Sequence, residues 1–499
     1  MQDDRLPVLV GGAQWTQRDA EPEDALEPLD VLAGLAQRAA EAAGAGARML
    51  EAVDTVGLVA VAGWAPGNGP RLLAKRLGAR PATELVTGTG GEISLRLVNA
   101  VAERIASGRS RVALLAGLSP MRTLRRARAQ GRVLRWQGGG DGRPDPLGDE
   151  RMGHDAREAR HGLDAPVHVY PLIENALRAR LGRGLDAHRA RLGRLFAPFT
   201  RVAEGNPHAW FPVRRSAEEL VRVTPSNRMI AYPYTKYLNA VLDTDQGAAL
   251  LLCSAAAARA FGVREDRCVY WWGGAHTEER AWHVSARPAI GDSPALRECA
   301  RRTLLQARVA SDELNAIDLY SCFPVAVELA CEAYGFREDD PRGLTVTGGL
   351  PYAGGPGSNY AMHAVAALAE RLRARPGAKG LTTGNGWYLT KHAACVWSSA
   401  PPSGPVGAPL EAPIVVGPAP LAVRDDAEGQ GTLDAWTVVY GRDGAPARGI
   451  VVGRLASGER FVANTPDERG FLESFVAAEQ VGARGSVRPR GETLRFVPG

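Results

Sequence analysis

Two stretches of the sequence decide the fold, because they repeat each other. The first is GGEISLRLVNAVAERIASGRSRVALLAG at residues 90–117, and the second is GSNYAMHAVAALAERLRARPGAKGLTTG at residues 357–384. Each opens on glycine, continues as an amphipathic helix, passes a basic turn and ends as a strand that closes on glycine. The two copies therefore predict two similar α/β units in one chain.

A second pair of windows extends the repeat toward the start of each unit. EAVDTVGL at residues 51–58 corresponds to NAIDLYSC at 315–322, and the offset in both pairs is about 265 residues. Strands that alternate with helices in this way are typical of a mostly parallel sheet covered by helices. We therefore predict an α/β fold of two tandem repeats, with an N-terminal half at 1–280 and a C-terminal half at 281–400.

The remainder of the chain predicts two further units. An insertion of about 100 residues, from 120 to 220, interrupts the first half and contains two expected helices, at 171–182 and 186–204. Residues 398–413 are rich in Pro, Gly and Ser, which is typical of a linker. Residues 414–499 then alternate β-branched residues with turn signals, and we expect them to form a small all-β barrel of the five-stranded OB type.

Composition excludes several functions. The chain has 60 basic and 55 acidic residues, and this small surplus does not indicate a nucleic-acid partner. No run approaches the roughly 18 apolar residues of a membrane span. Six cysteines without C-x-x-C spacing predict neither a disulfide framework nor a metal site. Because the N-terminus also lacks the features of a signal peptide, we expect a cytoplasmic protein.

One segment of the insertion carries a concentrated positive charge. MRTLRRARAQGRVLR at residues 121–135 contains no acidic residue. It is either a solvated charged loop or a seat for an anionic ligand such as the phosphates of coenzyme A. In the second case Arg122, Arg125 and Arg126 would be the ligand-binding residues.

Several phrases, together with this organisation, make the chain similar to a known family. The two halves, the insertion and the β-domain resemble the thiolase superfamily and, more narrowly, the bacterial thiolase-like proteins of type 1, which often carry the name acetyl-CoA acetyltransferase. The resemblance covers essentially the whole chain and implies acyltransferase-like chemistry on coenzyme A thioesters in lipid metabolism. The phrases are YPLIENALR (170–178), NPHAW (206–210), NRMIAYPYTKYLN (227–239), DLYSCFPVAVE (318–328) and GNGWYLTKHA (384–393).

The resemblance also implies where the catalytic groups of a thiolase should lie, and several are missing. A thiolase uses a nucleophilic cysteine at a helix start, a second cysteine and a histidine. Here VTGTGGE at 86–92 opens the first helix, and no cysteine precedes Cys253. GGPG at 354–357 replaces the Gly-His-Pro motif, and GNG at 384–386 lies where the second cysteine belongs. We therefore expect no cysteine-dependent thiolase activity.

Other polar residues fall near the expected pocket. In sterol-carrier-type thiolases the fourth motif reads His-Asp-Cys-Phe, and here it reads Tyr-Ser-Cys-Phe at 320–323. Each candidate also has a simpler interpretation, as a small buried thiol, a core tyrosine or a structural histidine. The candidate acid/base groups are Tyr320, Cys322, Tyr360 and His392, and the candidate backbone donors to an oxyanion are Gly90, Gly91, Gly354 and Gly355.

Two hypotheses follow. The first is an enzyme that makes or breaks a carbon–carbon bond, or transfers an acyl group, on an acyl-CoA or related carbonyl substrate. Some thiolase relatives cleave CoA-linked side chains by a retro-aldol reaction with tyrosines in place of the cysteines, and they require an OB-type partner domain.

The second hypothesis is a non-catalytic binding or scaffold protein that keeps the fold and engages a partner such as a hydratase-like enzyme. A continuous pocket beside Tyr320 and His392 favours the first hypothesis, whereas a pocket filled by side chains such as Trp387 favours the second. The sequence leaves a monomer and a homodimer equally open.

Overall fold

The structure is a computed structural model that describes residues 3–404, 406 and 412–499. Its main sheet runs in the order β10-β11-β12-β9-β1-β8-β4-β2-β3-β5, and a further strand, β13, pairs with β9. The strands of the first half are β1 (Pro7–Thr16), β2 (Thr55–Leu58), β3 (Thr83–Thr87), β4 (Val112–Pro120), β5 (Asp145–Leu147) and β8 (Asp245–Ser254). Those that follow are β9 (Val269–Glu279), β10 (Ala316–Asp318), β11 (Lys379–Gly386), β12 (Lys391–Ser398) and β13 (Ile414–Val416).

The strand order confirms the repeat. Outward from the centre, the first half runs β1, β8, β4, β2, and the second half runs β9, β12, β11, β10. The repeated windows form the same elements twice, α4 (Ile93–Ala106) with β4 and α13 (Tyr360–Arg373) with β11. The α/β fold of two tandem repeats is therefore confirmed.

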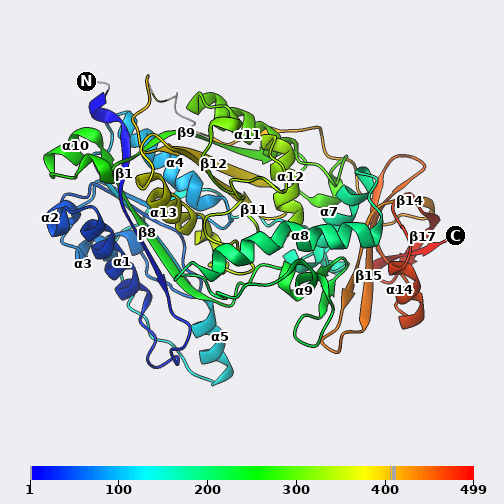
Figure 1. The fold of residues 1–499 in the computed structure, drawn as a ribbon. Coiled ribbons are helices and arrows are strands. Elements are labelled where there is room, and N and C mark those ends of the chain that lie inside the picture. The colour runs from blue at the N-terminus through cyan, green and yellow to red at the C-terminus, as the bar shows by residue number, and fades with distance from the viewer. Residues whose placement is uncertain (1–2, 405, 407–411) are drawn as a thin grey trace.

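The helices form layers around the strands of the two halves (Figure 1). Helices α4 and α13 contact strands of both halves, so they form a buried middle layer. The outer face of the first half is covered by α1 (Pro28–Ala42), α2 (Gly46–Glu51), α3 (Gly69–Arg76) and α10 (Ala255–Ala260), and that of the second half by α11 (Pro294–Ala307). Because the middle helices start where the two halves meet, the fold brings both helix starts toward a common region.

Local sequence signals set the ends of the helices of the second half. The Ser293 side chain caps α11, and Pro294 occupies its first turn. Helix α12 (Pro324–Tyr334) begins with a proline and ends at Gly335, whose φ of 71° is left-handed. Helix α12 packs on α11 and on two helices of the insertion, so it joins the second half to the inserted unit.

The insertion is largely helical. It contains α5 (Met121–Ala129), α6 (Ala156–Arg160), α7 (Pro166–Arg180), α8 (Leu185–Glu204) and α9 (Ala217–Val221). The prediction of a charged loop from residue 121 was wrong for its first nine residues, which form α5. The helix forms because it buries Thr123 and Ala127 on one side, and because Asp245 accepts hydrogen bonds from the Thr123 backbone and hydroxyl.

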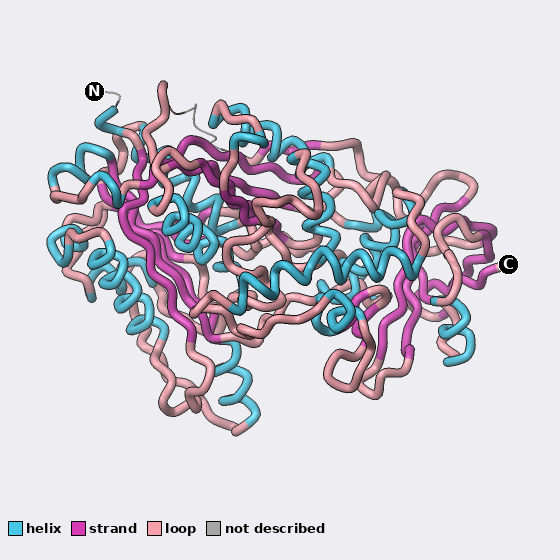
Figure 2. The backbone as a smooth tube through the Cα atoms, in the orientation of Figure 1, coloured by secondary structure: helices cyan, strands magenta, loops and turns pink. Residues whose placement is uncertain are grey.

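The C-terminal unit is a closed five-stranded barrel, as predicted, and Figure 2 shows its strands at the right of the molecule. The strands follow the order β14-β15-β16-β18-β17, and β14 and β15 pair along most of their length. They are β14 (Gly429–Tyr440), β15 (Pro446–Leu455), β16 (Arg460–Asn464), β17 (Arg484–Arg490) and β18 (Thr493–Pro498), with α14 (Arg469–Val476) between β16 and β17. Six of the sixteen residues of the predicted linker, 405 and 407–411, lie outside the described residues.

The barrel is joined by strand pairing to the segment that follows the insertion, and by hydrogen bonds to the insertion itself. Strand β6 (Met229–Ala231) pairs with β14, and β7 (Tyr234–Thr235) pairs with β6. The amide of Asn175 on α7 donates to the carbonyl oxygens of Tyr232 at 3.1 Å and of Trp436 at 3.0 Å. The barrel therefore shares a sheet with the segment after the insertion, and buried hydrogen bonds link both to α7 of the insertion.

Strand β5 covers one edge of the main sheet. It pairs in parallel with β3, from Leu85 opposite Asp145 to Thr87 opposite Leu147. An uncovered edge strand offers unpaired backbone groups to another chain, and β5 removes that opportunity at β3. Among the described residues, no helix has both the length and the apolar character needed to cross a bilayer.

Candidate functional site

The candidate site lies where the starts of the two middle helices meet the strands of the opposite half. At the start of α4, the Cα of Glu92 lies 2.8 Å from the position that a Cβ on Gly384 of β11 would take. At the start of α13, the Asn359 side-chain oxygen lies 2.2 Å from the position that a Cβ on Gly117 of β4 would take, and the Asn359 amide donates to the Gly117 carbonyl oxygen at 2.8 Å. Glycine at both strand positions permits this approach, since any side chain there would collide.

A buried ion pair occupies the first of these two places. Lys391 Nζ lies 2.9 Å from Glu92 Oε1, and each side chain is 2% exposed. The Lys391 ammonium also donates to the carbonyl oxygen of Thr89 at 2.9 Å. Burial raises the pKa of Glu92, and the attraction of Lys391 opposes this shift. The sequence analysis did not select Glu92, although an acidic residue in the apolar opening of a repeated helix was a usable signal.

Cys322 and Tyr320 are buried next to this pair. The Tyr320 hydroxyl lies against Gly91, and its ring meets that of Tyr360 edge-to-face at 5.4 Å. The Asn385 amide contacts Cys322 Sγ at 3.7 Å. The structure therefore places three of the four predicted acid/base groups, Tyr320, Cys322 and Tyr360, in one buried region, and the two tyrosine rings are in contact.

Tyr170 on α7, which the sequence analysis did not single out, completes this contact set. Its hydroxyl accepts from the Asn385 amide at 2.9 Å and donates to the carbonyl oxygen of Trp387 at 2.6 Å. Its ring stacks on Phe323 with centroids 4.3 Å apart. Tyr170 thus fastens the insertion to the predicted motif at 320–323.

Tyr360 has different partners. Its hydroxyl bonds to the Thr347 hydroxyl at 2.6 Å and donates to Asp318 Oδ1 at 3.1 Å. Asp318 in turn accepts from the Val346 backbone at 2.8 Å. This network ties the β10 end to the loop before α13, so the Tyr360 hydroxyl is engaged in structural contacts.

His392 lies one strand away from the cysteine. It is opposite Asn385 in the β11–β12 pair, and its Nε2 is 3.2 Å from Ser293 Oγ and 3.3 Å from the Leu389 carbonyl oxygen. Its hydrogen-bond partners among the described residues thus lie at the cap of α11 and in the β11–β12 turn, and not at the predicted acid/base groups.

Burial keeps the candidate groups uncharged. It raises the pKa of Cys322 to about 12, and it raises the pKa values of Tyr320, Tyr360 and Tyr170 well above the usual range. It lowers the pKa of His392 to about 3. A cysteine nucleophile needs a lowered pKa to supply thiolate. At neutral pH, Cys322 is a thiol and His392 a neutral imidazole.

The space between these groups is small. The cavity that Tyr320, Asn385 and His392 share has a volume of about 10 Å³. That volume holds about one water molecule. The centre of the site is therefore filled by the protein's own side chains in this structure.

The other predicted binding groups have partners within the protein. The Gly90 N–H donates to Ser358 Oγ at 3.1 Å, and the Gly355 N–H donates to the Val241 carbonyl oxygen at 2.8 Å. Gly354 lies against the Gln246 side chain. Two of the four proposed oxyanion donors are thus already engaged.

The three predicted phosphate-binding arginines lie on α5, which projects from the lower end of the sheet in Figure 1. Arg125 bonds to Asp243 at 2.8 Å, and Arg126 pairs with Glu21. The Arg122 guanidinium lies 5.7 Å from the centre of the Trp210 ring. These contacts use the charge of α5 to hold neighbouring loops.

Two open grooves, of about 490 and 600 Å³, lie along α8 and share Arg194 and Pro198. The larger groove is also lined by Arg201, Arg214 and Arg215. Arg194, Arg201 and Arg214 are exposed, and none of the three forms an ion pair with another described residue. We call the larger groove, of about 600 Å³, the α8 arginine groove. The sequence analysis did not predict it.

The two α/β halves around a buried layer of two helices place the protein in the thiolase class. Similarity to known proteins identifies the family within that class. The chain is 33% identical to a monomeric SCP2-thiolase-like protein type 1 from Mycobacterium smegmatis, with 100% of both chains covered and a TM-score of 0.83. The chain belongs to the SCP2-thiolase-like protein type 1 family. Residues 409–492 match the family described as thiolase-like protein type 1 additional C-terminal domain.

Two further solved structures share the fold at lower identity. An Ltp2–ChsH2(DUF35) aldolase is 17% identical over 80% of this chain and 99% of that one, with a TM-score of 0.60. An acetyl-CoA acetyltransferase from Syntrophomonas wolfei is 15% identical over 79% of this chain and 99% of that one, with a TM-score of 0.57. No curated protein matches the chain.

Proposed function

We propose that this protein is a non-catalytic member of the thiolase fold that binds an anionic ligand of the acyl-CoA type in the α8 arginine groove. The observation that carries the proposal is the contrast between a central cavity of about 10 Å³ and a groove of about 600 Å³. A pocket for a drug-sized ligand needs about 300 Å³ or more. The groove meets that requirement and the central cavity does not.

The chemistry of the groove favours phosphates. Arginine guanidinium groups bind phosphate oxygens in a bidentate manner, and unpaired ones are free to do so. Arg194 and Arg201 are seven residues apart on α8, so they lie on the same face of the helix two turns apart. The side chains of Ala197, Pro198 and Ala217 also line the groove and would suit an apolar part of the ligand.

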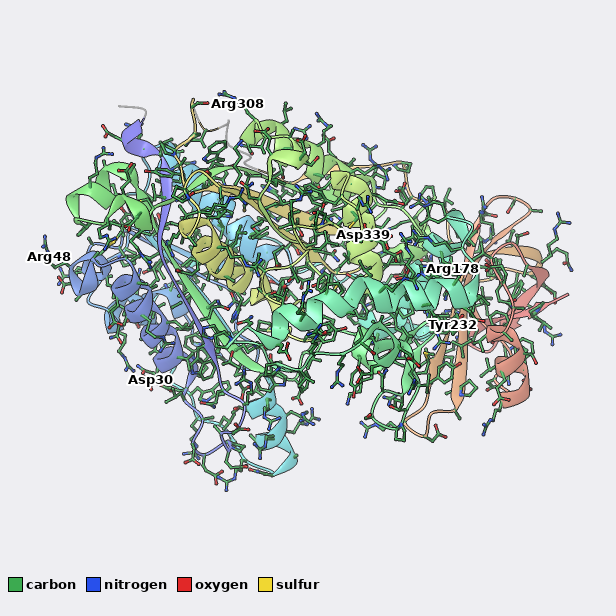
Figure 3. The ribbon with its side chains drawn as sticks, in the orientation of Figure 1. Asp30, Arg48, Arg178, Tyr232, Arg308 and Asp339 are labelled. Atoms are coloured by element: carbon green, nitrogen blue, oxygen red, sulfur yellow. The ribbon has the colours of Figure 1, made fainter. Side chains whose placement is uncertain are left out.

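Calorimetric titration with coenzyme A tests the proposal. The double variant R194E/R201E is expected to weaken binding about 100-fold, since each charged hydrogen bond contributes about 1.5 kcal/mol. The matched control is R48E, which reverses an exposed arginine on α2 at the far left of Figure 3. Equal affinity in the double variant and the native protein, or an equal loss in R48E, would contradict the proposal.

A second candidate function is carbon–carbon bond cleavage or acyl transfer at the predicted site. It is favoured by the contacts among Cys322, Asn385 and Tyr170, and by the likeness of the fold to a structure described as an aldolase. It requires the central cavity to open. A panel of β-hydroxyacyl thioesters of coenzyme A would release an aldehyde or ketone, and C322A would abolish the release. Absence of product across the panel would exclude this candidate.

We also propose that the protein is a monomer in the reducing cytoplasm. In the scaffold role it would engage a partner such as a hydratase-like enzyme. The six cysteines are buried and unpaired, which suits a reducing compartment. Strand β5 covers the β3 edge, and the Mycobacterium smegmatis relative is described as monomeric.

Replacing residues 144–148 with an equal length of Gly-Ser sequence should uncover the β3 edge and cause self-association. Light scattering coupled to size exclusion measures the mass, which is expected to move toward twice that of the chain. The control is the same replacement in the β14–β15 hairpin at 441–445, which leaves β3 covered. A monomeric 144–148 variant would show that β5 does not determine the oligomeric state.

A further inference from the structure

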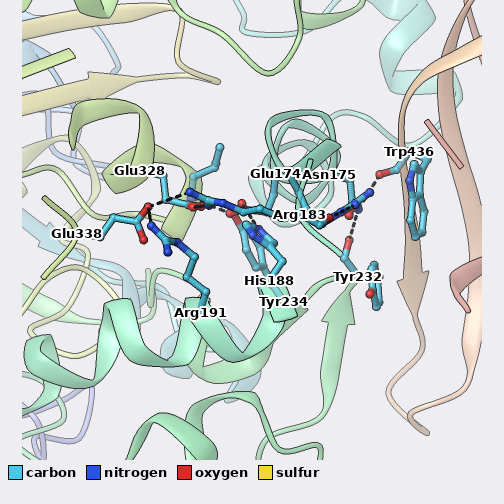
Figure 4. A network of polar contacts seen from close by, with 12 residues as sticks. Glu174, Asn175, Arg183, His188, Arg191, Tyr232, Tyr234, Glu328, Glu338 and Trp436 are labelled. Carbon is cyan, nitrogen blue, oxygen red and sulfur yellow. Dashed lines mark hydrogen bonds and ion pairs between the residues drawn. The ribbon is translucent and has the colours of Figure 1, made fainter. Parts of the chain in front are cut away.

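Three ionisable side chains converge below the α8 arginine groove, in a region that the predicted site does not include. Glu174 on α7, His188 on α8 and Glu328 on α12 are all at most 2% exposed. One donor atom from each lies within 4.8 Å of the other two, and His188 Nε2 is 2.7 Å from Glu174 Oε1. Figure 4 shows the three side chains pointing toward one another from their separate helices.

Two atoms of this cluster, Glu328 Oε2 and His188 Nδ1, are buried without a hydrogen-bond partner among the described residues. Glu328 Oε1 is held by Arg183, but Glu328 Oε2 is buried and forms no hydrogen bond with any described residue. An unsatisfied buried carboxylate oxygen is costly, and a second carboxylate beside it adds repulsion. Arg183 is the cation beside this cluster, and it pairs with Glu328 Oε1 and not with Oε2.

We propose that Glu174, His188 and Glu328 bind one divalent transition-metal ion of the zinc type. An imidazole nitrogen with two carboxylate oxygens is a donor set that such ions accept, and a fourth position remains for water.

Neighbouring residues hold the three donors in place. The Tyr234 hydroxyl donates to Glu174 Oε2, and Arg183 bridges Glu328 and Glu338. Such outer contacts orient the ligands of a metal site. The smaller groove along α8, of about 490 Å³, is lined by Glu328 and Arg183 and provides a path from solvent.

A bound ion would connect the insertion to the second half. Helices α7 and α8 belong to the insertion, and α12 belongs to the second half. The ion would fix the position of α8, and with it Arg194 and Arg201, relative to the thiolase body. This site is independent of the proposed function, because it does not require that the groove binds a ligand.

The competing explanation is that Glu174 and Glu328 share a proton without any metal. Protein stripped with a chelator and titrated with Zn²⁺ separates the two. We expect one equivalent to bind, the thermal midpoint to rise, and Co²⁺ to give visible absorption bands of a nitrogen- and oxygen-ligated ion. In E328Q and, separately, H188Q, affinity should fall at least about 100-fold. The control E332Q changes another carboxylate of α12, one that pairs with Arg180 and is not a ligand, and it should bind as the native protein does.

Three results would overturn the proposal. One is the absence of Zn²⁺ and Co²⁺ binding to the native protein. Another is unchanged affinity in both E328Q and H188Q. The third is a Co²⁺ spectrum with sulfur-to-metal charge transfer, which would place the ion at a cysteine. If E328Q has the same or higher thermal midpoint without metal and the native protein binds none, the shared proton is the correct account.

Discussion

Replacement of Lys391 by methionine is expected to lower the free energy of unfolding by about 3–5 kcal/mol at pH 8, because it leaves the Glu92 carboxylate buried without its counter-ion. Both side chains are 2% exposed, so water cannot replace the lost ammonium group. Glu92 Oε2 already forms no hydrogen bond within the described part of the chain. Denaturant unfolding of K391M beside the native protein measures the loss.

The loss should depend on pH in a defined direction. Burial raises the folded-state pKa of Glu92, so its contribution to stability is fully present at low pH and is lost as pH rises through the folded pKa. Removing Lys391 raises that pKa further. K391M should therefore lose less stability at pH 5, where Glu92 can take up a proton, than at pH 8.

The matched control is the double variant E92Q/K391M, which removes both charges. It should be more stable than K391M at pH 8, because replacing a whole buried pair costs less than breaking it. A loss in K391M that does not change with pH, or a double variant no better than the single one, would show that the pair is not held as a buried charge.

Replacement of Tyr170 by alanine is the second large effect, with an expected loss of about 3–5 kcal/mol, the range for a buried aromatic truncated to alanine. The ring stacks on Phe323 and meets Tyr388 edge-to-face. Tyr170→Phe keeps the ring but leaves the Trp387 carbonyl oxygen without its donor, so it should lose about 1–2 kcal/mol.

Unfolding monitored by tryptophan fluorescence and by circular dichroism measures both variants. Tyr440→Phe in the barrel serves as the control, since that ring is half-buried and its change should stay within about 0.5 kcal/mol. If Tyr170→Ala cost no more than Tyr170→Phe, the stacking would not hold the insertion against the 320–323 motif.

The fold could be predicted from the sequence because its evidence is local and repeated. Helices α4 and α13 carry the same pattern of small and apolar residues, and Asp54 and Asp318 both accept backbone hydrogen bonds beside their strands. The α5 helix was missed because its arginine content suggested a solvated loop. Its formation depends on Asp245, which is more than a hundred residues away.

The site could be predicted only in part, because its contacts, like those of α5, depend on residues far apart in the sequence. Adjacent sequence positions placed Tyr320 near Cys322, but which partner each group has depends on distant residues. Glu92 is paired by Lys391, and Arg125 by Asp243, whereas Arg194 has no carboxylate partner among the described residues. Sequence shows the charge of a side chain and not whether another segment neutralises it.

The pairing of β6 with β14 has a consequence for how the protein is made. Ala231 and Val439 are partners in one sheet, yet the ribosome joins them into the chain about 200 residues apart. The β6 segment therefore cannot complete its sheet, and one of its edges stays unpaired, until the ribosome has synthesised the barrel sequence. The barrel is thus not a detachable appendage: gene fusions or natural rearrangements that end the chain before it would release an unfinished insertion rather than a smaller functional protein.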